Sequence, residues 1–87
     1  MLPFKETFLE NTTYLRTFYE NVESGDMTWH RDREDRVIEP THDTDWTFQI
    51  DNQLPQKIDK KIFIPKGVYH RLIKGNGDLI LKVSKFK

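Results

Sequence analysis

Hydrophobic and polar residues alternate most regularly over positions 46–51, which read Trp-Thr-Phe-Gln-Ile-Asp. A period of two is typical of a β-strand that buries one face. Three shorter apolar runs are bounded by proline or glycine turns, at 61–64, 68–73 and 79–83. The pattern therefore predicts four strands in the second half of the chain.

The first half of the chain is less regular. Apolar residues over 4–22 fit a helical stripe, but this segment is also rich in threonine, tyrosine and phenylalanine, which favour strands. We expect a short irregular or helical opening, followed by a strand over about 13–22. A turn at 23–26 then leads to a second strand within 27–37, which contains neither glycine nor proline.

Six or seven short strands with little helix predict an all-β sandwich or barrel. The 87 residues are enough for one domain with a modest core. We therefore expect a single domain over 1–87, with an N-terminal extension over 1–12 and a barrel over about 13–84.

Charge and composition narrow the possible functions. Lysine and arginine number 14, as do the acidic residues, so the formal net charge is zero and nothing favours binding to nucleic acid or an anionic membrane. There are no cysteines, so any metal must be held by histidine and carboxylate. No apolar run approaches the roughly 18 residues of a membrane span, and no signal peptide is evident. A cytoplasmic protein is expected.

Three residues are candidates for a metal site. His70 follows a Pro-x-Gly turn by three residues and lies in an apolar run. His30 and Asp32 are two residues apart, so on an extended chain their side chains share a face. Two imidazoles and one carboxylate form the set that holds non-haem Fe(II) and leaves other positions open, although manganese, nickel, cobalt and zinc accept the same ligands.

The segment 65–70, Pro-Lys-Gly-Val-Tyr-His, resembles the second conserved motif of the cupin superfamily, and 77–81 is similar to the hairpin and closing strand of that family. The first cupin motif is His-x-His followed by glutamate. Here Asp32 takes the place of the second histidine, and Arg36 falls where the glutamate belongs. The resemblance, from Met27 to Val83, implies a small double-stranded β-helix, or jelly-roll barrel, with a metal inside. The His-x-Asp and distant His pattern is also similar to JmjC and 2-oxoglutarate oxygenases, which implies iron.

Other residues could complete a ligand pocket. If the strand is regular, Arg36 shares the face of His30 and Asp32, where it could bind a carboxylate or phosphate, or simply neutralise Asp32. Gln49 and Tyr69 are further candidates for contact with a small-molecule ligand. We expect His42 to be exposed in a polar loop. Three aromatic residues are expected in the core: Trp29, Trp46 and Phe48.

Two classes of function fit these observations. In the first, the protein holds a mononuclear divalent metal and binds or transforms a small polar molecule, as a dioxygenase, isomerase or lyase. In the second, it is a metal-free, non-catalytic cupin that binds a small ligand or a partner chain, with Asp32 and Arg36 paired inside the barrel. No catalytic residue is identified. Exposed strand edges favour a homodimer, with the aromatic-rich segment 14–19 as the expected contact.

Overall fold

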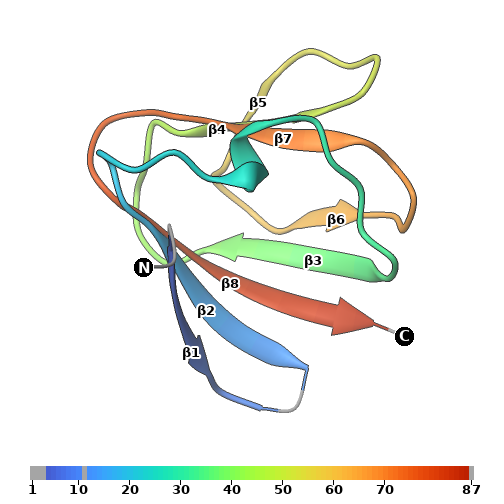
Figure 1. The fold of residues 1–87 in the computed structure, drawn as a ribbon, viewed down its shortest axis with the longest axis horizontal. Coiled ribbons are helices and arrows are strands. Elements are labelled where there is room, and N and C mark those ends of the chain that lie inside the picture. Colours follow the sequence, from blue (N-terminus) through green and yellow to red (C-terminus); the bar gives the residue numbers. More distant parts are fainter. Residues whose placement is uncertain (1–3, 11, 87) are drawn as a thin grey trace.

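The computed structural model describes residues 4–10 and 12–86. These residues form strands and one 3₁₀ helix (Figure 1), with the following bounds: β1 Phe4–Phe8, β2 Thr13–Phe18, η1 Gly25–Met27, β3 Asp35–Pro40, β4 Thr47–Ile50, β5 Gln56–Lys57, β6 Ile62–Ile64, β7 His70–Ile73 and β8 Leu79–Phe86. No helix among these residues is long and apolar enough to cross a membrane.

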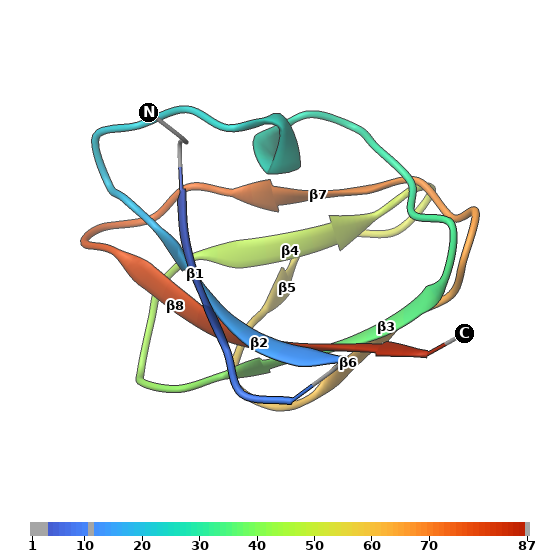
Figure 2. The ribbon, with the colours of Figure 1, turned by 60° about the horizontal axis from the view of Figure 1, so that its bottom comes forward.

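The strands form two antiparallel sheets, which face each other in Figure 2. One sheet has five strands in the order β1-β2-β8-β3-β6, and the other has three in the order β5-β4-β7. β8 lies between β2 and β3, and Val83 of β8 is paired with Tyr14 on one side and Ile38 on the other. This arrangement confirms the predicted all-β jelly roll.

The core fills the space between the sheets. Leu79, Leu81 and Val83 alternate along β8 and are buried, as are Phe48 and Leu72 from the smaller sheet. Burial of this apolar face is the main source of stabilisation, at roughly 25 cal/mol per Å² removed from water. Trp46 is also buried, and its Nε1 donates to the Gly77 carbonyl at 2.9 Å.

The strands predicted in the second half of the chain are confirmed. The segments 46–51, 61–64 and 68–73 contain β4, β6 and β7, respectively, and the segment 79–83 is the first part of β8. β8 continues to Phe86, three residues beyond the predicted end, because its last residues pair with the start of β3. The segment 52–60, between the strands predicted over 46–51 and 61–64, contains the two-residue strand β5.

The helical or irregular opening expected over 1–12 is wrong for the residues described. Phe4–Phe8 is strand β1, which pairs with β2 in a register that places Phe8 opposite Tyr14. Pairing along a whole strand outweighs the weak helical stripe, since propensity is easily overridden by tertiary contacts. β2 then ends at Phe18 rather than near position 22. Residues 1–3 and 11 lie outside the described residues.

The regular strand expected within 27–37 is also wrong. The chain forms η1, where the Ser24 side chain caps the helix by accepting a hydrogen bond from Asp26 N, and β3 begins only at Asp35. Between them, an irregular segment runs from η1 beside β7 to the larger sheet (Figure 2). His30 and Asp32 therefore lie on this connection. Trp29, expected in the core, is 43% exposed and lies 4.7 Å from the Arg71 guanidinium.

Candidate metal centre

Backbone hydrogen bonds bring His30 and His70 side by side. His30 N donates to His70 O at 3.0 Å, and His70 N donates to His30 O at 2.8 Å, so the two residues form an isolated antiparallel bridge. Directly paired residues of an antiparallel bridge project their side chains to the same face. The two imidazole rings accordingly lie with centroids 4.3 Å apart.

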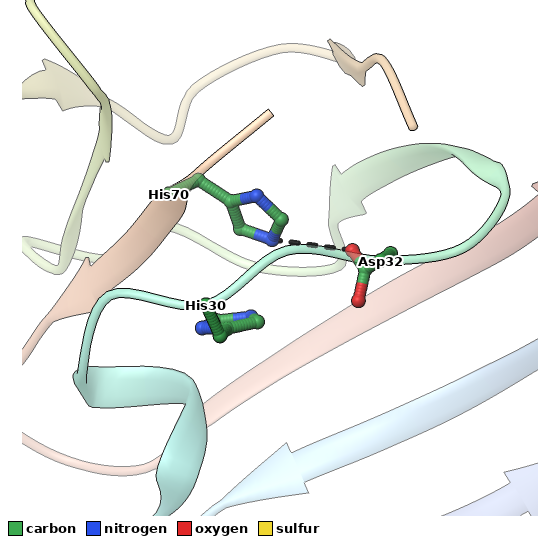
Figure 3. Close-up of side chains that lie close together, drawn as sticks. All are labelled: His30, Asp32 and His70. Atoms are coloured by element: carbon green, nitrogen blue, oxygen red, sulfur yellow. Dashed lines mark ion pairs between the residues drawn. The ribbon is translucent and has the colours of Figure 1, made fainter. Parts of the chain in front are cut away.

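The turn before β7 fixes Asp32 beside the histidines. Gly67 adopts a positive φ of 77°, which glycine tolerates, and its N–H donates to the Asp32 carbonyl at 2.9 Å. The Pro-x-Gly turn therefore holds the connection that carries Asp32. One ligand atom from each of His30, Asp32 and His70 lies within 4.8 Å of the others (Figure 3).

Among the three candidate ligands, His70 has the most buried side chain. The side chains of His70, Asp32 and His30 are 4%, 10% and 27% exposed, respectively. Asp32 Oδ2 is buried, accepts no hydrogen bond from the described residues and lies 3.2 Å from His70 Nε2. A buried carboxylate oxygen without a donor is costly, so this geometry favours a cation between the two atoms.

Both histidines are fixed in the same tautomer. His30 Nδ1 lies 2.8 Å from the Thr28 carbonyl oxygen, and His70 Nδ1 lies 2.8 Å from the Val68 carbonyl oxygen. A carbonyl only accepts hydrogen bonds, so each Nδ1 carries the hydrogen and, in the neutral ring, each Nε2 presents a lone pair. Metal-binding histidines are commonly oriented by such a hydrogen bond from the other ring nitrogen.

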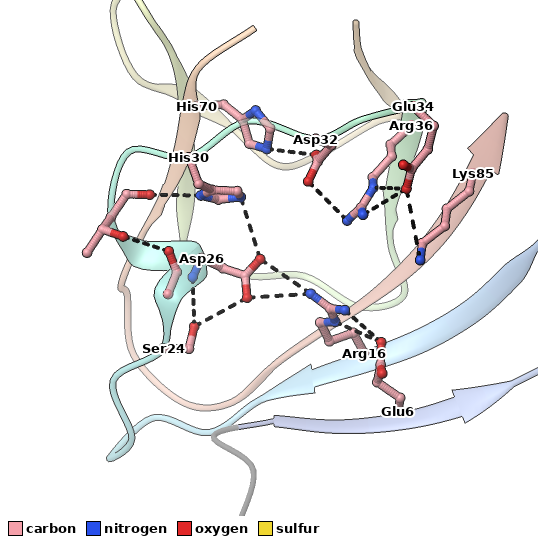
Figure 4. Close-up of polar contacts among 12 residues, drawn as sticks. Glu6, Arg16, Ser24, Asp26, His30, Asp32, Glu34, Arg36, His70 and Lys85 are labelled. Carbon is pink, nitrogen blue, oxygen red and sulfur yellow. Dashed lines mark hydrogen bonds and ion pairs between the residues drawn. The ribbon is translucent and has the colours of Figure 1, made fainter. Parts of the chain in front are cut away.

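An arginine holds the carboxylate that faces His70. Arg36 Nη1 lies 3.4 Å from Asp32 Oδ1, and Arg36 donates to Glu34 Oε1 from Nε at 3.1 Å and from Nη2 at 2.9 Å (Figure 4). Lys85, at the more exposed rim, lies 3.9 Å from Glu34. These contacts leave the other Asp32 oxygen, Oδ2, directed at His70.

A second arginine makes a similar set of contacts beside His30. Arg16 donates to Glu6 Oε2 at 2.7 Å, and its Nη1 lies 3.3 Å from Asp26 Oδ1. Asp26 Oδ1 in turn lies 3.6 Å from His30 Nε2. Figure 4 shows the two series, Glu6-Arg16-Asp26-His30 and Glu34-Arg36-Asp32-His70, converging on the two imidazoles.

The surroundings keep Asp32 ionised. Burial by itself would raise the pKa of this carboxyl, but the contact with His70 and the positive charge of Arg36 outweigh burial and hold the pKa below its usual value. A deprotonated carboxylate and unprotonated imidazole nitrogens are the forms that bind a metal ion.

The three candidate ligands line a small pocket of about 40 Å³. Its polar wall also includes Arg36, as predicted, together with Arg16 and Asp26. The remaining wall is apolar, formed by side chains such as Phe48 and Leu72. The pocket has room for a few water molecules or a small ligand group.

Two predicted ligand-contact residues do not line this pocket. Gln49 accepts a hydrogen bond from Arg71 Nε at 2.9 Å and donates to the Gln53 carbonyl at 3.0 Å. Tyr69 is 43% exposed and lies under the Arg31 guanidinium. Both side chains alternate with inward residues of β4 and β7, which directs them away from the core. His42 is exposed, as expected, and its Nε2 accepts a hydrogen bond from Ile80 N.

Arg16 and Asp26 are pocket residues that the sequence interpretation missed. A signal for Arg16 existed, because it lies two residues from Tyr14 and from Phe18, which are buried on the inner face of β2. Asp26 had a weaker signal, its position four residues before His30. The approach of Asp26 to His30 depends on the turn formed by η1. The strand predicted within 27–37 did not allow for this turn.

Solved structures of known proteins share this fold, whereas no protein-family model and no curated protein matches the sequence. A DMSP lyase, DddQ from Ruegeria pomeroyi, matches with a TM-score of 0.71 at 12% identity over 98% of this chain. A structure of FeII HppE matches with a TM-score of 0.61 at 13% identity over 85% of this chain. A cupin domain from Bordetella pertussis matches with a TM-score of 0.64 at 15% identity over the whole chain.

The extent of these matches differs. This chain spans 47% of the Ruegeria lyase chain and 41% of the HppE chain, but 98% of the Bordetella cupin domain. The match therefore corresponds to nearly the whole of the Bordetella cupin domain and to part of a longer chain in the other two proteins. At these identities the likeness establishes architecture, and it agrees with the cupin-like motif over 65–70. The chain has the cupin fold.

Proposed function

We propose that this protein binds one divalent metal ion through His30, Asp32 and His70. The observation that carries the proposal is the set of lone pairs that converge in the pocket. Both Nε2 atoms are exposed to the pocket by the Nδ1 hydrogen bonds, and Asp32 Oδ2 is buried without a donor among the described residues. A metal ion satisfies all three atoms at once.

Iron is the metal that we favour. Two histidines and one carboxylate are the ligands of mononuclear non-haem Fe(II) sites, and HppE, which shares the fold, was solved in its FeII form. When bound, such a metal would supply Lewis-acid or redox chemistry at its open positions. The chain's own contribution is to orient Asp32 through Arg36 and to keep bulk water away with the apolar wall.

The ligand that we propose is a small polar molecule. The pocket is small, and the Arg36 guanidinium on its wall is held in place by Glu34 and Asp32. A fixed arginine can donate hydrogen bonds to an acidic or carbonyl group with little loss of side-chain entropy. If the protein is an enzyme, a dioxygenase, isomerase or lyase reaction fits such a site.

A second candidate function rests on the 3.4 Å contact between Arg36 and Asp32. In this alternative, the cluster is a structural network in a metal-free cupin that binds a small ligand or a partner chain. A proton on His70 Nε2 would then occupy the place of the metal and form an ion pair with Asp32.

Metal analysis of protein purified without chelator distinguishes the two functions. We expect close to one equivalent of metal in the wild type and a strong reduction in His30→Gln. The matched control is His42→Gln, because His42 is an exposed histidine outside the pocket. Metal content that is substoichiometric in the wild type and unchanged in His30→Gln would support the metal-free alternative.

The homodimer that we propose does not form through the segment 14–19. That segment contains most of β2, which lies between β1 and β8 and has no free edge, and both Tyr14 and Phe18 are buried. β1 is an edge of the larger sheet and carries Phe8, which is 72% exposed. Sedimentation at micromolar concentration should give a dimer mass for the wild type and a monomer mass for Phe8→Asp.

A further inference from the structure

The sequence around the two histidines is repeated. Residues 29–31 read Trp-His-Arg and residues 69–71 read Tyr-His-Arg, so each histidine follows an aromatic residue and precedes an arginine. In the antiparallel bridge between His30 and His70, position 29 lies opposite position 71, and position 31 lies opposite position 69. Each aromatic residue is therefore placed across from the arginine of the other segment.

The side chains in these opposite positions are in contact. The Arg71 guanidinium lies 4.7 Å from the centroid of the Trp29 ring, and the Arg31 guanidinium lies 5.2 Å from the centroid of the Tyr69 ring. Both distances are within the roughly 6 Å of a cation–π interaction. Because side chains alternate along extended backbone, the two pairs lie on the outer face, opposite the imidazoles, with one pair on each side of the bridge.

The pair formed by Trp29 and Arg71 is also attached to the smaller sheet. Arg71 Nε donates to Gln49 Oε1 at 2.9 Å, and Gln49 Nε2 donates to the Gln53 carbonyl at 3.0 Å. Gln49 and Arg71 are themselves register partners in β4 and β7. The guanidinium that contacts Trp29 is thus held by the sheet, so little side-chain entropy is lost when the ring packs against it.

The two histidines depend on the bridge to different degrees. His70 belongs to β7, where it is paired with Ile50 of β4. His30 lies on the connection between η1 and β3, where no strand of the described residues continues the bridge. The backbone hydrogen bonds that join His30 to β7 are the two to His70. Contacts on either side of the bridge therefore decide how firmly the His30 imidazole is placed.

We propose that Trp29 and Tyr69 are positioning residues for the metal centre, each acting through the arginine across the bridge. The proposal rests on the proposed metal binding by His30, Asp32 and His70. The two cation–π pairs hold the bridge closed from both sides and keep the His30 Nε2 atom near the other two ligand atoms. Without the pairs, the isolated bridge opens more readily and the ion loses its most exposed ligand.

The test is a Co²⁺ titration of chelator-stripped protein, followed by calorimetry and by the visible absorption of the bound ion. Trp29→Ala and Tyr69→Ala each remove one ring, and the double variant removes both. Trp29→Phe keeps an aromatic face for Arg71. Phe63→Ala is the matched control, because Phe63 is a 55% exposed aromatic residue of β6, away from the bridge. Circular dichroism in chelator checks that each variant is folded.

We expect each alanine variant to weaken Co²⁺ binding about two- to fivefold, which corresponds to the loss of one exposed cation–π interaction. The double variant should bind about 5- to 20-fold more weakly and give a changed visible spectrum, because His30 no longer coordinates as in the wild type. Trp29→Phe should recover most of the wild-type affinity. Phe63→Ala should remain within about 1.5-fold of the wild type, with an unchanged spectrum.

A double-mutant cycle tests whether the ring acts through the arginine. Arg71→Gln, which leaves both rings in place, should weaken binding about as much as Trp29→Ala, and Trp29→Ala should have little further effect in the Arg71→Gln background. A ring that only stabilises the fold would lower the thermal midpoint but leave the dissociation constant and the spectrum unchanged, since nearly all molecules remain folded at 25 °C.

Two results overturn the proposal. Wild-type affinity and spectrum in the double variant would show that the bridge places His30 without the pairs, and fully additive effects of Trp29→Ala and Arg71→Gln would show that the two residues act separately. Both results leave the proposed metal binding intact. A wild type that binds no Co²⁺ instead refutes that metal binding, and the positioning role fails with it.

Discussion

At the residue scale, the same kind of local hydrogen bond orients each of the two histidines. Each Nδ1 binds the carbonyl two residues earlier, at Thr28 and at Val68. In both cases the carbonyl lies two residues before the histidine, so the sequence neighbourhood of each histidine provides its own support. The neighbouring carboxylates are positioned by other contacts, because Arg36 holds Asp32 and Arg16 holds Asp26.

Removal of the hydroxyl oxygen of Tyr14 should stabilise the protein. This hydroxyl is buried, has no hydrogen-bond partner among the described residues and has a pKa that burial raises. Tyr14→Phe keeps the ring that packs near Phe8 and below Arg16. We expect the free energy of unfolding in urea to rise by about 1 kcal/mol, because an unsatisfied polar group is removed. A loss of stability would show that the hydroxyl has a partner.

The low pKa of Asp32 predicts an acid dependence of stability. The unfolded carboxyl, with a pKa of about 3.9, binds a proton more readily than the native one, so its ionised form stabilises the native state above this pKa. This contribution is lost as pH falls through the lower native pKa. In chelator, the stability advantage of the wild type over Asp32→Asn should shrink between pH 5 and pH 3. An advantage that stays constant over this interval would contradict the prediction.

At the element scale, the turn between β7 and β8 depends on a close approach to the chain before β4. A Cβ on Gly75 would lie 2.7 Å from Trp46 N and closer still to Asp45 Oδ1. Asp45 also accepts hydrogen bonds from Asn76 N at 2.7 Å and from Asn76 Nδ2 at 2.8 Å. The turn therefore has no room for a side chain at position 75.

Gly75→Ala should destabilise the protein by about 1 to 3 kcal/mol, because backbone atoms must move to relieve the overlap. For a chain of this size, each kcal/mol lowers the thermal midpoint by about 4 to 8 °C. Gly25→Ala is the matched control, since a Cβ at Gly25 meets nothing within 4 Å. It should change stability by less than about 0.5 kcal/mol. Equal midpoints for the two variants would refute this account of the turn.

The elements that the sequence predicted well are those with one buried face. The alternation over 46–51 and 79–83 follows from burial against the opposite sheet, which is a local signal. β1 lacks that signal, because Lys5, Glu6 and Thr7 interrupt its aromatic residues and its strand conformation comes from pairing with β2. The turn at η1 was missed because it depends on a cap in which the Ser24 side chain accepts a hydrogen bond from Asp26 N.

The candidate site was predictable to the extent that its ligands lie in short motifs. The spacing of His30 and Asp32, and the turn before His70, were sufficient to propose that the three residues meet, as they do. Asp26 and Arg16 could not be placed in the same way. Their positions depend on how η1 and β2 pack against β7 and β8, which is a tertiary property.

At the scale of the whole molecule, the pocket joins elements that are far apart in the sequence. Its polar wall takes residues from β2, from η1, from the connection before β3, from β3 and from β7. A small β domain has a limited core, so the proposed cation, which would link these elements, would contribute a substantial share of its stability. Metal binding and folding should therefore be coupled.

This coupling predicts a large thermal shift on metal binding. An ion present at 100 times its dissociation constant stabilises the native state by about 2.7 kcal/mol, provided that the unfolded chain does not bind it. At about 4 to 8 °C per kcal/mol, the thermal midpoint of stripped protein should rise by roughly 10 to 20 °C on addition of Fe²⁺ without oxygen, or of Co²⁺. Chelator should reverse the shift, and His42→Gln should show it in full. Asp32→Asn should show little, since it lacks the charged ligand. A midpoint that metal leaves unchanged in the wild type would mean that ion pairs alone stabilise the cluster.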